Sequence, residues 1–176
     1  DAIGYPDGHV WDLGGVQVRA VHMPGHTAGH CVLLVEPEGV AFIGDIDLTG
    51  FGPYYGDACS SLAAFRRTVE RIADLPARTW VTSHHKGVIT DRAQFLKLLK
   101  AFGEKFDLRG EAIFGALAAQ PRSLDELVSH RFLYPLGYED VYIEDAERRT
   151  IAEHLDELIA AGRVALREGI YSAVPG

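Results

Sequence analysis

The chain has 176 residues, of which 47% are hydrophobic, and this is enough for one domain, or one domain and a smaller second one, around a hydrophobic core. Its formal net charge of −8 argues against nucleic acid as a partner, and its short apolar runs exclude a transmembrane helix. Two cysteines give no disulfide framework and, with no visible signal-peptide pattern, they favour a reducing, cytoplasmic setting.

The N-terminal part of the chain is predicted to form strand pairs and then alternating helices and strands. A loop rich in Gly and Tyr is expected over 46–58, and helices should start at the caps Ser60 or Ser61 and Asp91. Strand pairs followed by alternating helices and strands favour helices packed in layers on β-sheets. The expected strands are 10–13, 16–22, 31–36, 40–43 and 79–83.

The composition changes near residue 110, where a second domain is expected to begin. Residues 110–176 contain six Arg, no Lys and twelve Asp plus Glu. Three helices followed by a hairpin are the layout of a winged helix, but the acidic balance predicts that this segment does not bind DNA. The predicted domains are therefore 1–109 and 110–176. The predicted helices are 111–119, a short helix after Ser123, and 146–161.

Three polar clusters lie where predicted strands end and loops begin. They are Pro24-Gly25-His26-Thr27-Ala28-Gly29-His30, Gly44-Asp45 and Ser83-His84-His85-Lys86-Gly87. Imidazole and carboxylate groups are ligands for zinc, iron or manganese. Because side chains at several strand ends can meet at one edge of a fold, we expect His26, Asp45 and His85 to converge on a metal centre.

In this order and spacing, the three clusters resemble metal motifs of the metallo-β-lactamase fold superfamily over about residues 8–105. The resemblance implies an α+β fold in which 1–109 is half of an αββα sandwich and 110–176 a winged-helix-like domain. It also implies that His26 holds one metal, that Asp45 bridges two metals in the catalytic centre, and that His85 holds the second. The doubled His leaves His84 open as an alternative to His85.

The family's first ligand cluster, His-x-His-x-Asp-His, has no match in residues 1–23. The resemblance therefore implies that this chain is the C-terminal half of the catalytic domain. An N-terminal half carrying the other metal ligands is the expected partner, and the chain alone is expected to be incomplete as a hydrolase. Half of a sandwich would leave the apolar inner face of its sheet uncovered. A second copy of the chain, in a homodimer, and the C-terminal domain folded back are the other ways to cover that face.

The implied activity is metal-dependent hydrolysis of a small-molecule substrate, with no role for a membrane. Two divalent cations, zinc first and iron or manganese as alternatives, would provide a hydroxide nucleophile for an ester-like carbonyl. A thioester, as in hydroxyacylglutathione hydrolases, is the leading substrate class, while lactone and phosphodiester substrates remain open. The competing hypothesis is a non-catalytic, acidic winged-helix interaction module on a degenerate metal-fold scaffold.

Other residues near these motifs have supporting roles in the same interpretation. The loop after Asp45 borders the active site in resembling proteins, so Tyr55, or Tyr54 beside it, is expected to contact substrate. His30 is expected to form hydrogen bonds behind the metal ligands. His154 is expected to be a surface or packing residue.

Overall fold

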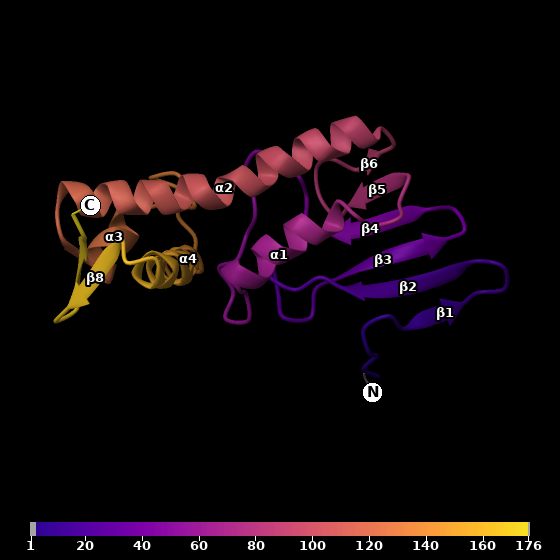
Figure 1. Cartoon of the computed structure of the whole chain (residues 1–176), viewed down its shortest axis with the longest axis horizontal. Coiled ribbons are helices and arrows are strands. Elements are labelled where there is room, and N and C mark those ends of the chain that lie inside the picture. The colour runs from indigo at the N-terminus through magenta and orange to yellow at the C-terminus, as the bar shows by residue number, and fades with distance from the viewer. Residues whose placement is uncertain (1–2, 176) are drawn as a thin grey trace.

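A six-stranded sheet occupies one end of the molecule in the computed structural model, which describes residues 3–175 (Figure 1). Its strands follow one another in chain order, and β4 and β5 form the parallel pair in an otherwise antiparallel sheet. The expected strands are confirmed to within a residue at each end. The strands are β1 (Val10–Asp12), β2 (Gln17–His22), β3 (Cys31–Glu36), β4 (Val40–Gly44), β5 (Thr79–Thr82) and β6 (Val88–Ile89).

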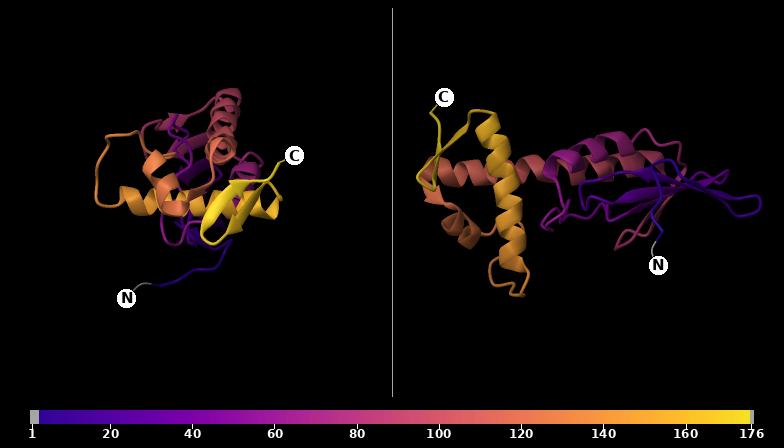
Figure 2. Two further views of the ribbon diagram at one scale, coloured as in Figure 1. Left: turned by 90° about the vertical axis from the view of Figure 1, so that its left-hand side faces the viewer. Right: turned by 90° about the horizontal axis from the view of Figure 1, so that it is seen from below.

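Helices α1 (Leu62–Ile72) and α2 (Arg92–Ala119) cover one face of this sheet (Figure 2). Both start at predicted caps: Ser61 accepts a hydrogen bond from the Ala64 amide, and Asp91 accepts one from the Gln94 amide. Alternate strand residues point toward the helices, because strand side chains alternate between the two faces. The buried strand residues include Val32, Leu34, Ala41, Ile43 and Trp80.

The opposite face of the sheet is apolar and carries no helix of the described residues (Figure 2). Leu33 pairs with Phe42 and Phe42 with Val81, so the three side chains share this face. Phe42 is 38% exposed, and Val88 on β6, which pairs with Val81, is 64% exposed. This uncovered face of the sheet is thus lined by apolar side chains.

Helix α2 joins the two ends of the molecule (Figure 1). The sequence predicted two helices here, and the predicted domain boundary at 109/110 falls inside the single helix. Gly103, Gly110 and Gly115 do not interrupt it, since a helical Gly costs only about 1 kcal/mol relative to Ala. Its N-terminal half packs on the sheet, and its C-terminal half packs in a second core with Leu127, Ile151 and other apolar residues.

The second core is closed by short helices and a three-stranded sheet of order β7-β9-β8. Ser123 and Glu126 form a capping box at the start of α3. The long helix expected at 146–161 starts three residues earlier. The elements are β7 (Arg122–Ser123), α3 (Leu124–His130), α4 (Ile143–Ala160), β8 (Val164–Arg167) and β9 (Ile170–Ala173). Within 3–175, no helix has the length and hydrophobicity needed to cross a membrane.

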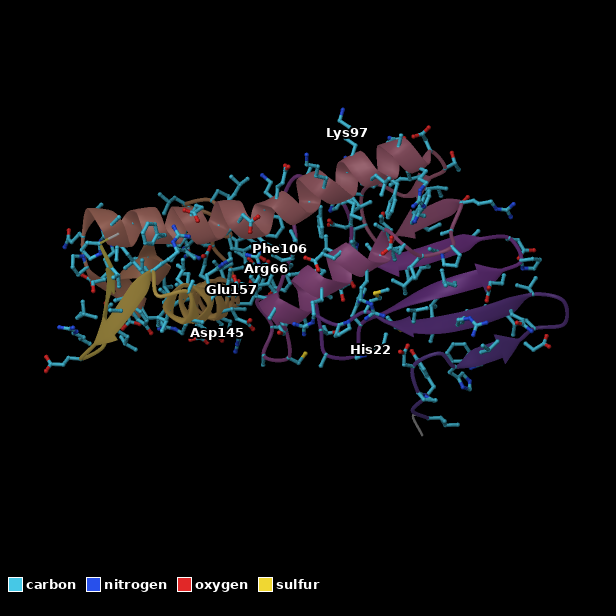
Figure 3. All side chains as sticks on the ribbon, in the orientation of Figure 1. His22, Arg66, Lys97, Phe106, Asp145 and Glu157 are labelled. Atoms are coloured by element: carbon cyan, nitrogen blue, oxygen red, sulfur yellow. The ribbon has the colours of Figure 1, made fainter. Side chains whose placement is uncertain are left out.

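Charged side chains connect α1 and α4 where the two cores meet (Figure 3). Arg66 donates to both carboxylate oxygens of Glu157 at 3.0 and 3.2 Å, and to Asp107 at 2.8 Å. Its guanidinium also lies 5.0 Å from the ring centroid of Phe106. A bidentate pair holds its partners in a defined geometry, so this contact fixes α4 against α1.

Candidate metal centre and adjoining cavity

His26 lies on the loop after β2, and the surrounding backbone fixes its ring. Gly25 has φ +136°, and a Cβ at this position would overlap the backbone of Phe65 in α1. The Nδ1–H of His26 donates to the Tyr54 carbonyl at 3.0 Å, because a carbonyl oxygen can only accept. Its Nε2 is therefore left with a free lone pair, as a metal ligand requires.

Asp45 follows β4 and is held from behind by His30. The Asp45 amide donates to His30 Nε2 at 3.3 Å, while His30 Nδ1–H donates to the Met23 carbonyl at 2.8 Å. Burial lowers the pKa of His30, which favours the neutral ring that this accepting role requires. Gly44 leaves room for this arrangement, since a Cβ there would lie 2.7 Å from His30 Nε2. The expected hydrogen-bonding role of His30 is thus what the structure shows.

Two histidines flank the Asp45 carboxylate, one on each oxygen. His26 Nε2 lies 3.6 Å from Oδ2, and His84 Nε2 lies 3.0 Å from Oδ1. Two ligand atoms about 2.0–2.2 Å from a tetrahedral ion lie roughly 3.3–3.6 Å apart, so the His26 spacing matches and the His84 spacing is slightly short. Within residues 3–175, no three His, Cys, Asp or Glu side chains surround a single ion position. The donor set fits a bridging carboxylate with one imidazole on each side.

The structure brings His84, rather than the predicted His85, to Asp45. Thr82 Oγ1 and the Lys86 amide both donate to the His84 carbonyl at 2.7 Å, which closes a tight turn after β5. His85 takes the left-handed conformation in this turn, with φ +57°, and it does not line the cavity beside Asp45. The alternative that the sequence left open is therefore the one that the geometry favours.

A cavity of about 350 Å³ adjoins these three residues. His26, Asp45 and His84 line it, together with four Phe and Tyr rings. Sequence reasoning missed three of the rings, two of which belong to the segment after α3. The signal for these two was a run of Tyr at a spacing of four residues, interrupted by Pro and Gly. The aromatic lining residues are Phe51, Tyr54, Tyr134 and Tyr142.

The model of the metallo-beta-lactamase superfamily matches residues 8–99, just over half of the chain. The chain belongs to the metallo-β-lactamase superfamily. The matched region contains the three metal motifs and the sheet, so the resemblance seen in the sequence is confirmed.

Several known proteins are similar over most of this chain. An atrochrysone carboxyl ACP thioesterase from Pseudocercospora fijiensis is 27% identical over 172 residues, covering 92% of this chain and 47% of that protein. A hydroxyacylglutathione hydrolase from Methylococcus capsulatus is 29% identical over 140 residues, covering 76% of this chain and 53% of that protein. The crystal structure of a metallo-beta-lactamase family protein from Thermus thermophilus superposes with a TM-score of 0.78 at 28% identity. The superposition covers 99% of this chain and 55% of that chain. The chain spans about half the length of these relatives.

In this superfamily member, Tyr55 lies in the core and Tyr54 lies in the cavity, which corrects the expectation that Tyr55 contacts substrate. Tyr55 is 0% exposed. Its hydroxyl lies 2.8 Å from His154 Nε2 and 3.4 Å from Arg109 of α2. Consecutive residues of an extended loop point to opposite sides, so only one of the two rings can reach the cavity.

His154 is buried in this hydrogen-bond network with Tyr55, and we predict that it lowers the stability of the fold in acid. Burial, with the nearby charges of Arg66 and Arg109, lowers its pKa to about 3. The unfolded chain therefore takes up a proton at His154 at a higher pH than the folded chain does. The free energy of unfolding falls as the pH drops below about 6.5, and His154 accounts for about 2 kcal/mol of this loss at pH 5. In urea unfolding, the free energy of unfolding of His154→Gln should fall less between pH 7 and pH 5 than that of the wild type, by about the contribution of His154. The exposed His130→Gln is the control, and an unchanged acid slope in His154→Gln would contradict the assignment.

Proposed function

We propose that the protein containing this chain is a metal-dependent hydrolase that cleaves an ester-like carbonyl, with thioesters as the lead substrate class. The observation that carries this proposal is the Asp45 carboxylate, with His26 on one oxygen and His84 on the other, at the edge of a cavity. The volume of that cavity lies within the roughly 300–1,000 Å³ typical of small-molecule sites.

Two divalent cations would be held here, with His26 Nε2 on one, His84 Nε2 on the other, and Asp45 between them. Imidazole nitrogen and carboxylate oxygen suit zinc, with iron or manganese as alternatives. Bound cations of this kind supply Lewis acidity and a nucleophilic water at neutral pH. The role of His30 is to orient Asp45 through its backbone amide, and the Tyr54 carbonyl fixes the tautomer of His26.

Thioester hydrolysis forms a C–O bond from water and breaks the C–S bond, giving a carboxylic acid and a thiol. The names of the two similar proteins, an ACP thioesterase and a hydroxyacylglutathione hydrolase, support this class. Lactones and phosphodiesters remain the alternative substrates.

The remaining metal ligands are proposed to come from an N-terminal half of the domain. A zinc site usually needs three or four protein ligands, and this chain offers two side chains to each cation. The open apolar face of the sheet, with Leu33, Phe42 and Val81, would be covered by the same half. The division into 1–109 and a winged-helix-like 110–176 also belongs to this proposal, supported by the two separate hydrophobic cores.

Zinc binding by two neighbouring variants tests the centre directly. In the full-length protein, His84→Ala should weaken zinc binding by more than about tenfold, since even outer partners of metal ligands typically contribute 10–100-fold. His85→Ala should leave it unchanged, because that ring does not line the cavity. Competition with a chromogenic zinc chelator at neutral pH measures both. Weaker zinc binding in His85→Ala alone would identify His85 as the ligand. Unchanged zinc binding in both variants would show that this loop supplies no metal ligand.

A further inference from the structure

The cavity beside Asp45 is lined by aromatic rings of two distant segments. Phe51 and Tyr54 come from the loop after β4, and Tyr134 and Tyr142 come from the segment between α3 and α4, which stands out from the molecule (Figure 2). The Phe51 and Tyr134 ring centroids are 5.4 Å apart, and those of Tyr134 and Tyr142 are 6.0 Å apart. We call these four residues the aromatic wall.

Buried charged groups hold both parts of the aromatic wall in place. Arg109 of α2, which is 6% exposed, donates to the carbonyls of Phe51, at 2.6 Å, and Pro53. The carboxylate of Glu147 in α4 is 0% exposed and accepts from the Tyr134 amide at 2.7 Å and from the two preceding amides. Both loops are therefore fixed before any ligand arrives, which reduces the entropy cost of binding.

The aromatic wall carries no charged side chain. Burial together with the neighbouring tyrosines raises the pKa of Tyr134, so its hydroxyl stays protonated at neutral pH. A flat apolar group can stack on these rings.

We propose that the aromatic wall is the acyl-binding side of the site and selects thioesters of flat, aromatic acyl groups over short aliphatic ones. The proposal rests on the thioesterase function proposed above and adds its specificity. The reacting carbonyl would face Asp45 and the two histidines, while the acyl group would lie against the rings of Tyr134 and Tyr142. These two tyrosines are then specificity-determining residues supplied by the C-terminal part of the chain.

Paired substrates that share one leaving group test this inference. The zinc-loaded full-length protein and its Tyr134→Leu and Tyr142→Leu variants are compared on naphthoyl and acetyl thioesters of N-acetylcysteamine. We expect each variant to raise KM for the naphthoyl thioester about three- to tenfold and to change KM for the acetyl thioester by less than about twofold. Leu136→Ala is the control, since it lies on the same loop, is 76% exposed and does not line the cavity. An equal change for both substrates would overturn the proposal.

A binding measurement keeps the aromatic wall testable even if no thioester is cleaved. Turnover of neither substrate would refute the thioesterase function, and saturation-transfer NMR on the metal-free protein would then decide on the wall. Naphthamide should bind more tightly than acetamide, and Tyr134→Leu should remove the difference. Adenosine binding as tightly as naphthamide would overturn the proposal, because it would assign the rings to stacking on a nucleotide base.

Discussion

Asp45→Asn should abolish zinc loading and hydrolysis in the full-length protein. The Asp45 carboxylate is the group that faces both His26 and His84. Its replacement by an amide removes the negative charge and puts a hydrogen-bond donor where a metal requires an acceptor. The loss should exceed the ~10–100-fold typical of an outer hydrogen-bond partner. Zinc content by elemental mass spectrometry and turnover of an acyl thioester measure the two effects.

His30→Ala is the matched comparison for Asp45→Asn. It removes the ring that accepts from the Asp45 amide and leaves the carboxylate itself in place. Activity should fall by about 10–100-fold, with zinc still bound at saturating concentration. Equal losses in the two variants would mean that His30 and Asp45 have the same role, which would contradict the arrangement of a ligand and its supporting hydrogen bond.

The choice between neighbouring residues is where sequence reasoning on the site reached its limit. The motifs correctly placed His26 and Asp45 together, because each follows a strand of the same sheet and a Gly that frees the backbone. His84 and His85 differ by one position in a turn, and the positive φ at His85 that separates them is not encoded in a ligand pattern. The same holds for Tyr54 and Tyr55, where Arg109 and His154 from distant helices decide which ring is buried.

The aromatic wall shows a second kind of limit. Tyr134 and Tyr142 reach the cavity beside Asp45 because Glu147 holds the loop before α4 and because α2 spans both cores as one helix. These are long-range contacts, and local periodicity carries no information about them. Local signals were sufficient for the strands and for the caps Ser61 and Asp91, since those depend on neighbouring residues in the chain.

Gly25→Ala should destabilise the fold by several kcal/mol. A φ of +136° is strained for any L-residue with a side chain, at a cost of about 1–3 kcal/mol. The added Cβ would also overlap the backbone of the buried Phe65, and overpacking typically costs about 1–3 kcal/mol more. The loop cannot retreat freely, because the Gly25 carbonyl accepts from the Ser61 amide at 2.9 Å and the Pro24 carbonyl from Thr68 at 2.7 Å. The free energy of unfolding in urea measures the loss.

Gly29→Ala is the control for this prediction, because Gly29 belongs to the same motif and a Cβ there would meet nothing within 4 Å. Its unfolding midpoint should stay near that of the wild type, while that of Gly25→Ala should fall sharply. Zinc binding should follow the same order, since the turn at Gly25 aims His26 at Asp45. A stable Gly25→Ala variant with normal zinc affinity would show that this turn can be built without a glycine, and that the close packing of the loop on α1 does not position the ligand.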